Sequence, residues 1–141
     1  METTSPSQDR ILLYGNKKLM SVLYKEILYL EADNSYLSVY LSRNREPVLL
    51  FQSLSQASEL LQNNYFFQIS RNHIVNLTKV KTIDVCHKKL YLDNKIELCI
   101  SSDRLDDCIV AYSKIHDVIL GKLPTRISNM LSNPQNLPFN P

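Results

Sequence analysis

The chain has 141 residues, 44% of them hydrophobic, which is enough for one domain with an ordinary core. Its formal net charge is +2, from 16 Lys and Arg against 14 Asp and Glu, so bulk charge argues neither for nor against a nucleic-acid partner. No window approaches the roughly 20 apolar residues of a membrane span, and the start METTSPSQDR lacks the apolar core of a signal peptide. These features favour a cytoplasmic protein that does not contact a membrane.

Both ends of the chain lack hydrophobic periodicity. Ser, Thr, Gln and Pro dominate the first nine residues, and the end SNMLSNPQNLPFNP contains three Pro and four Asn. We therefore expect an N-terminal extension over residues 1–17, a folded domain over 18–120, and a loosely ordered Pro/Asn-rich tail over 121–141.

The first predicted elements are strands. YLSVYL places Leu37, Val39 and Leu41 on one face, which is typical of a half-buried strand. EILYLEA before it and EPVLLF after it are similarly β-like, and residues 43–46 form the turn between the second and third segments. The three segments predict a meander.

The period then changes to that of a helix. Ser53, followed three residues later by Gln56, has the form of a capping box. The predicted helix has about ten residues. Its core face is formed by Leu54, Ala57, Leu60 and Leu61.

Short β-compatible segments follow, FFQI, HIVN and VKTIDV, and then KLYLDNKIELCI predicts a hairpin. A three-residue loop over 93–95 opposes Leu90 to Leu98 and Leu92 to Ile96, whereas a two-residue loop opposes the same leucines to charged residues. The three-residue loop is preferred.

The last predicted element is a helix from Asp103 to Leu120, with Ser102 as N-cap and with Gly121 and Pro124 as the stop. The apolar residues that recur at helical spacing are Leu105, Ile109, Tyr112, Ile115 and Ile119. The fold class is therefore mainly β, mostly antiparallel, with a short helix in the middle and a C-terminal helix.

Several kinds of chemistry are disfavoured. With glycine only at Gly15 and Gly121, no Gly-rich phosphate loop can form. Three cysteines cannot all pair, and their spacing is unlike that of a structural zinc site, so we expect reduced thiols. Cys86 and His87 are neighbours in or near a strand, so they point to opposite faces and form no nucleophile–base pair. We expect no enzyme, catalytic residue, metal or cofactor.

The stretch NNYFFQISRNHIVNLTKV is unusual because a polar run interrupts apolar residues. Ser70, Arg71, Asn72 and His73 suit a protrusion for phosphate or base-edge contacts, but physical grounds alone favour reading His73 as a partly exposed residue between strands. The segment from Arg71 to Lys95 contains six basic and two acidic residues, a local excess of positive charge. Each of its lysines is also consistent with an ordinary solvent-exposed surface. The flanking core is expected to comprise Phe66, Phe67, Ile69, Ile74 and Val75, with Asn76 turning the chain.

Taken in order, ILYLEADNSYLSVYL, SLSQASELL, FFQISRNHIVNLTKVKTI and DNKIELCIS resemble the LytTR domain, a DNA-binding module of bacterial transcription regulators. The resemblance runs from about Lys18 to Ile119. It implies a compact sandwich of short β-sheets with flanking helices, which binds DNA through loops at one edge instead of a recognition helix. In such domains loops enter successive major grooves and the DNA bends.

The resemblance also implies three contact regions. The first is the loop ADNSY, with Asn34, Ser35 and Tyr36. The second is the ISRNH segment, where Arg71 falls on the family's Arg and is the best candidate for a base contact; Ser70 stands where His is common, and His73 where Tyr or Phe is common.

The third region follows the last strand, where the family often has Pro-Val-Ser-Arg and this chain has Cys-Ile-Ser-Ser. Ser102 therefore replaces the family's Arg, and Arg104 is expected to reach the same phosphates. Further phosphate partners are expected at Lys79, Lys81, Lys88 and Lys89.

The expected function is sequence-specific binding of double-stranded DNA by a transcription regulator, with a homodimer on repeated half-sites. Because too few residues precede the match for a receiver domain, we expect a stand-alone regulator controlled by concentration or by a protein partner. The alternative is a LytTR-like interaction module that sequesters a related regulator without strong DNA binding.

Overall fold

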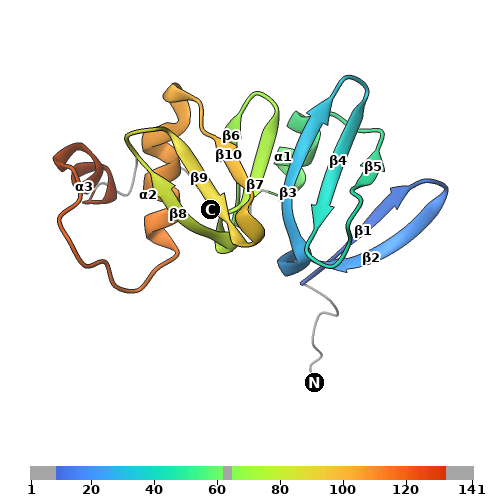
Figure 1. Ribbon diagram of the computed structural model, residues 1–141, viewed down its shortest axis with the longest axis horizontal. Coiled ribbons are helices and arrows are strands. Elements are labelled where there is room, and N and C mark those ends of the chain that lie inside the picture. Colours follow the sequence, from blue (N-terminus) through green and yellow to red (C-terminus); the bar gives the residue numbers. More distant parts are fainter. Residues whose placement is uncertain (1–8, 62–64, 133–141) are drawn as a thin grey trace.

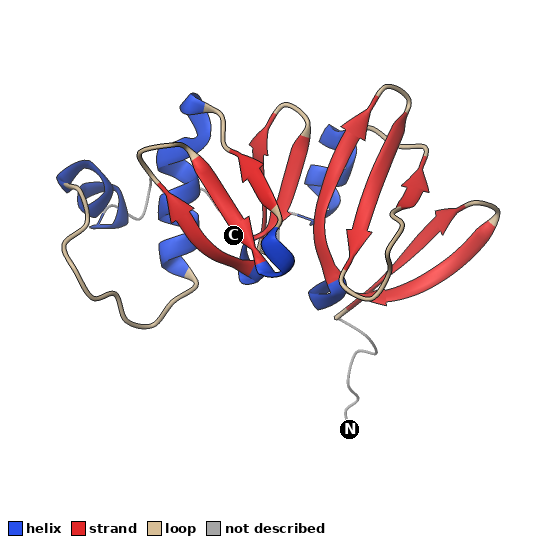
Figure 2. Cartoon of the chain, in the orientation of Figure 1, coloured by secondary structure: helices blue, strands red, loops and turns tan. Residues whose placement is uncertain are grey.

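The computed structural model describes residues 9–61 and 65–132. Within these residues the strands form a two-stranded hairpin, a five-stranded sheet and a three-stranded sheet, all antiparallel, with helices packed alongside (Figures 1 and 2). The strands are β1 (Arg10–Gly15), β2 (Lys18–Leu23), β3 (Ile27–Asp33), β4 (Tyr36–Leu41), β5 (Val48–Leu50), β6 (Phe66–Ser70), β7 (His73–Asn76), β8 (Val80–Asp84), β9 (Lys89–Leu92) and β10 (Glu97–Cys99). The helices are α1 (Leu54–Leu61), α2 (Leu105–Lys114) and α3 (Thr125–Ser132). Short 3-10 turns are η1 (Tyr24–Glu26), η2 (Leu77–Lys79), η3 (Asp93–Lys95) and η4 (Ser102–Arg104).

The predicted meander is confirmed. The five-stranded sheet has the order β5-β4-β3-β7-β6, so the meander supplies three adjacent strands. Leu37, Val39 and Leu41 are all buried, as their alternation requires. One face of this sheet packs against α1 and the β1–β2 hairpin, and the other packs against the three-stranded sheet and α2, which produces the expected sandwich.

The predicted hairpin also has the expected register. Leu98 pairs with Leu90 across β10 and β9, and the Leu92 N–H donates to the Ile96 carbonyl at 2.9 Å. The chain turns through η3, so the three-residue loop keeps the leucines in the core.

The capping box of α1 is confirmed, because the Gln56 N–H donates to Ser53 Oγ at 3.1 Å and the Ser53 N–H donates to Gln56 Oε1 at 3.3 Å. The predicted core face needs one correction: Leu60 is 66% exposed. Each helical residue turns about 100° from the last, and the buried side is set by Leu54, Ala57 and Leu61, so Leu60 lies beside that face.

The C-terminal prediction is wrong in two respects. The last long helix is α2, which ends at Lys114 instead of Leu120, and α3 lies inside the segment expected as a loose tail. The Pro124 carbonyl accepts the first backbone hydrogen bonds of α3, and Ile127 is completely buried against the core that contains α2. Apolar periodicity continues past Lys114, but burial does not, since Leu120 is 92% exposed.

The β1–β2 hairpin was not predicted, and β1 lies in the segment expected as an N-terminal extension. Its two-residue turn has positive φ at both positions, Asn16 (53°) and Lys17 (61°), as a type I′ turn requires. Gly15 allows the close approach of β1 to β5, because a Cβ there would lie 2.4 Å from the Leu49 carbonyl oxygen. No helix among residues 9–61 and 65–132 is long and apolar enough to cross a membrane.

Candidate nucleic-acid interface

Four connections lie along one edge of the molecule, the upper edge in Figure 1: the β3–β4 turn, the β6–β7 turn, the β8–β9 turn and the β10–α2 connection. Backbone hydrogen bonds join neighbours along this edge. The Ala32 N–H donates to the Asn72 carbonyl at 2.9 Å, and the Ser101 N–H donates to the Ile69 carbonyl at 2.9 Å. The β10–α2 connection meets the β8–β9 turn where Lys88 Nζ donates to Ser102 Oγ at 2.8 Å. We call this set of turns the polar edge.

The β3–β4 turn carries the first predicted contact residues, and all three are exposed. Asn34 adopts a left-handed backbone conformation with φ 57°, which asparagine tolerates better than most residues. The ring of Tyr36 packs against Phe51 with centroids 4.7 Å apart, so its orientation is restricted. Asn34 and Ser35 therefore form the tip of the turn.

The β6–β7 turn places Arg71 and Asn72 at the surface, while the predicted core residues on either side are all buried. Within the part of the chain that the structure describes, the Arg71 guanidinium has no ion-pair partner. A buried scaffold thus carries a solvent-facing cation, as a base-reading side chain requires.

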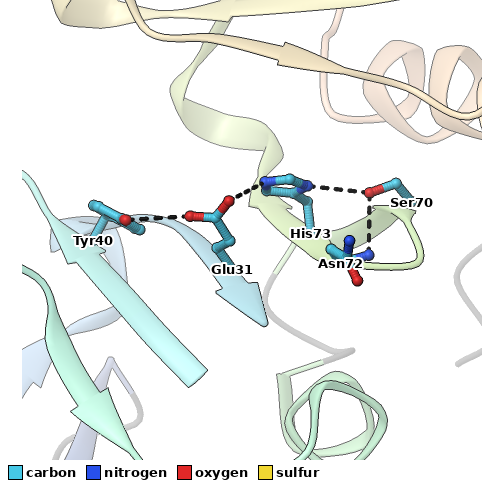
Figure 3. Close-up of polar contacts among 5 residues, drawn as sticks. All are labelled: Glu31, Tyr40, Ser70, Asn72 and His73. Atoms are coloured by element: carbon cyan, nitrogen blue, oxygen red, sulfur yellow. Dashed lines mark hydrogen bonds and ion pairs between the residues drawn. The ribbon is translucent and has the colours of Figure 1, made fainter. Parts of the chain in front are cut away.

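His73 is neither a free surface residue nor a simple core residue, because it lies in a chain of polar contacts (Figure 3). Its Nε2 lies 3.2 Å from Glu31 Oε2, and its Nδ1 lies 3.2 Å from Ser70 Oγ. The Tyr40 hydroxyl donates to Glu31 Oε1 at 3.2 Å, and the Asn72 N–H donates to Ser70 Oγ at 3.3 Å. The chain therefore links β4, β3 and the β6–β7 turn.

Two tyrosines support these contacts. Tyr29 and Tyr40 are stacked with ring centroids 4.3 Å apart and planes inclined by 9°. Burial, followed by the effects of Tyr40 and Glu31, raises the pKa of Tyr29 to about 12. Burial, followed by the Glu31 carboxylate, also raises the pKa of Tyr40. Both phenols keep their protons at neutral pH, so Tyr40 can donate to Glu31.

The β8–β9 turn places a basic residue beside Ser102, the position where the LytTR family often has an Arg. Lys88 is exposed, has φ 55°, and its ammonium group reaches Ser102. Nearby, His87 donates its backbone N–H to Asp84 and pairs with it at 2.8 Å, and these hydrogen bonds lower the pKa of Asp84. Cys86 and His87 lie in a turn beyond the end of β8, where both are exposed.

The other predicted cations are placed differently. Lys89 lies in β9 and pairs with Glu97 Oε2 at 2.9 Å, a contact that raises the pKa of Lys89. Lys79 lies in η2, at the opposite end of β7 from the β6–β7 turn, so the structure does not bring it to the polar edge. Lys81 is close to Lys79 in the chain, and its Nζ lies 3.9 Å from Asp93 Oδ1.

The Arg104 side chain connects parts of the polar edge through contacts with β6 and α2. Its Nε donates to the Gln68 carbonyl at 3.0 Å, and its guanidinium lies 4.5 Å from the centre of the Phe67 ring. A third contact reaches Asp107 Oδ2 at 3.6 Å. The side chain therefore holds η4 against β6.

Sequence reasoning missed Glu31, Tyr40 and Tyr29. The available signal was strand parity, because Tyr29 and Glu31 alternate with buried leucines in ILYLEAD and so share a face. His73, which contacts Glu31 on that face, lies 42 residues further along the chain. Their pairing depends on the β3–β7 register, which the sequence does not specify.

A separate cavity of about 510 Å³ lies between β1, α1 and the five-stranded sheet. Apolar side chains dominate its lining, so it offers no acid–base pair. Among residues 9–61 and 65–132, no three His, Cys, Asp or Glu side chains are grouped as metal ligands would be.

The three cysteines are free thiols, of which Cys86 and Cys99 are exposed and Cys108 is buried. Burial raises the pKa of Cys108 to about 12. Because the thiolate is the reactive form, iodoacetamide at about pH 8 is expected to label Cys86 and Cys99 in the folded protein and Cys108 only in denaturant. Intact-mass spectrometry with peptide mapping measures this. Labelling of Cys108 at the rate of Cys99 without denaturant would contradict the packing of α2.

The fold and the polar edge define a small β-rich domain that presents polar and basic turns on a rigid scaffold. The family model of the LytTr DNA-binding domain matches residues 17–113, and the chain belongs to this family. A similar solved structure is the LytTr DNA-binding domain of a putative methyl-accepting/DNA response regulator from Bacillus cereus. The two chains are 23% identical with a TM-score of 0.58, over 68% of this chain and 89% of that one. No curated protein sequence matches the chain.

Proposed function

We propose that the protein is a transcription regulator that recognises a specific double-stranded DNA site through its polar edge. The observation that carries this proposal is the contiguity of the four connections along one edge, because the turns among them carry Asn34, Arg71 and Lys88. Membership of a DNA-binding domain family supports the same partner.

In this proposal Arg71 and its turn read base edges in a major groove, and the β3–β4 turn and Lys88 lie on either side. Phosphate contacts fix the register of the protein and base contacts give specificity. Lys88 occupies the position next to Ser102, so it supplies the cation of the third contact region, while Arg104 keeps η4 in place. Two copies on repeated half-sites would raise the affinity through effective concentration.

The testing experiment is selection from a pool of random duplexes, followed by fluorescence-anisotropy titration of the best site and of a scrambled duplex. The expected result is one enriched motif, bound far more tightly than the scrambled sequence. Weak, salt-labile binding without an enriched motif would overturn the proposal.

Lys88→Ala is expected to weaken binding to the selected and scrambled duplexes by similar factors. The slope of log affinity against log salt should fall by about one unit, as for the loss of one phosphate contact. Lys79→Ala is the matched control, since Lys79 lies away from the polar edge. Equal changes for the two variants would show that Lys88 has no special position on the DNA.

A second function, sequestration of a related regulator, is favoured by one observation. Leu12, Phe51 and Leu60 are 61%, 78% and 66% exposed, and all three line the apolar cavity beside the β1–β2 hairpin. Exposed apolar groups that gather on one surface are typical of protein contacts. This function predicts that a Leu60→Ser variant loses a protein partner and that the wild type selects no DNA motif.

A further inference from the structure

We propose that Glu31 and Tyr40 are positioning residues for DNA reading, which act on the Ser70–His73 turn through the imidazole of His73. The inference rests on the proposed function, because it assigns how the base-reading turn acquires its shape. Neither residue needs to touch DNA. Figure 3 shows the path from Tyr40 on β4, through Glu31 on β3, to His73 and Ser70 at the two ends of the turn.

The hydrogen-bonding capacities along this path define one direction for each bond when only Nε2 of the imidazole carries a proton. An ionised carboxylate only accepts, so the proton between Glu31 and His73 belongs to Nε2 of the imidazole. In this tautomer Nδ1 is an acceptor and receives the Ser70 hydroxyl proton. The Ser70 oxygen keeps a lone pair for the Asn72 N–H. With this arrangement each group in the turn has one role, which favours the observed conformation of the turn.

The far end of the path is held by contacts on both Glu31 oxygens and by ring stacking. The Glu31 carboxylate has two oxygens, one on Tyr40 and one on His73. Tyr40 is stacked on Tyr29, and Glu31 stands opposite His73 in the strand register. Among the residues that the structure describes, the charged or titratable groups in contact with His73 are Glu31 and Tyr29 from β3, with Tyr40 behind Glu31 and Arg71 in the same turn.

Positioning and simple electrostatics predict opposite signs for the removal of Glu31. A carboxylate near DNA repels phosphates, so on charge alone Glu31→Ala should strengthen binding. If Glu31 positions the turn, the same substitution should weaken binding to the selected site about three- to tenfold, the equivalent of one hydrogen bond. Glu31→Gln, which retains a carbonyl acceptor for Nε2, should recover part of this loss. Glu46→Ala is the control, since it removes the same charge from the exposed β4–β5 loop.

A double-mutant cycle tests the path itself. Glu31 and Ser70 contact different nitrogens of His73 and share no hydrogen bond of their own. If His73 transmits the effect, the losses from Glu31→Ala and Ser70→Ala should be clearly less than additive. In a His73→Phe background, which keeps a ring but no nitrogen, the coupling should vanish. Additive losses in the wild-type background would overturn the inference.

A measurement without DNA separates this inference from the proposed function. Amide hydrogen exchange of Asn72, followed by NMR, reports the bond to Ser70 directly. Exchange should become several-fold faster in Glu31→Ala and His73→Phe and remain unchanged in Glu46→Ala. Unchanged exchange in the first two variants sinks the positioning role even if the wild type binds DNA. Faster exchange in a protein that selects no motif would sink the proposed function and leave the path intact, without a DNA-reading role.

Discussion

Arg71→Ala is expected to cost about 1 to 3 kcal/mol of binding free energy at the selected site and to relax the preference at one base position. Arg71 is exposed at the tip of the β6–β7 turn, and the residues before and after the turn are buried. A guanidinium in that position can donate two parallel hydrogen bonds to one guanine. Anisotropy titrations on the selected site and on its single-base variants measure both effects.

Arg45→Ala is the control for loss of a positive charge, because Arg45 is exposed in the β4–β5 loop at the other end of the sheet. It should leave the base preference intact. Arg71→Lys should also relax the preference, since an ammonium group cannot form the paired contact. A uniform loss for Arg71→Ala over all base variants, with a salt slope reduced by about one unit, would identify a phosphate contact instead.

The sequence predicted the parts of the fold that depend on local pattern. Alternation in YLSVYL identified β4, the pair Ser53 and Gln56 identified the start of α1, and parity in KLYLDNKIELCI identified the loop length of the β9–β10 hairpin. Each depends on residues close in the chain, so side-chain period and capping chemistry suffice.

Other parts depend on contacts between distant residues. The apolar period of α2 continues beyond its end, whereas the position of α3 depends on tertiary contacts such as the packing of Ile127 against the core. Gly15 is small because β1 passes close to the Leu49 carbonyl, a contact made by a strand far along the chain. Local sequence propensity cannot predict such contacts, because they join residues that are far apart in the chain.

The candidate site also has parts that the sequence predicted and parts that depend on contacts between distant residues. The family resemblance identified the turns that the structure joins, from Asn34 through Arg71 to Ser102, because each turn is a short motif in the sequence. It did not distinguish Lys88 at the edge from Lys79 at the far end of β7, because a lysine's surroundings depend on tertiary structure. The whole network that connects Glu31 to His73 depends on strand pairing and was missed.

Asn76→Ala is expected to lower the free energy of unfolding by about 2 to 4 kcal/mol, because the buried hydrogen bond to the Ile27 carbonyl and three part-buried hydrogen bonds of Asn76 are lost together. Asn76 is 2% exposed at the end of β7. Its Nδ2 donates to the Ile27 carbonyl at 2.9 Å and to the Tyr24 carbonyl at 3.3 Å. Its Oδ1 accepts from the Thr78 N–H at 3.0 Å and from the Thr78 hydroxyl at 2.7 Å. Urea denaturation followed by circular dichroism measures the loss as a lower midpoint at constant slope.

Thr78→Val is the matched control, because it removes one donor to Asn76 Oδ1 and leaves the two bonds of Nδ2 in place. It should cost only about 0.5 to 1.5 kcal/mol, the usual net value of one hydrogen bond. A comparable loss for both variants would mean that water takes over the carbonyls of Tyr24 and Ile27. If Asn76→Ala costs more stability than Thr78→Val, the bonds from Asn76 Nδ2 are what join the start of β3 to the end of β7. These two strands carry Glu31 and His73 opposite each other, so the same asparagine also stabilises the scaffold of the polar edge.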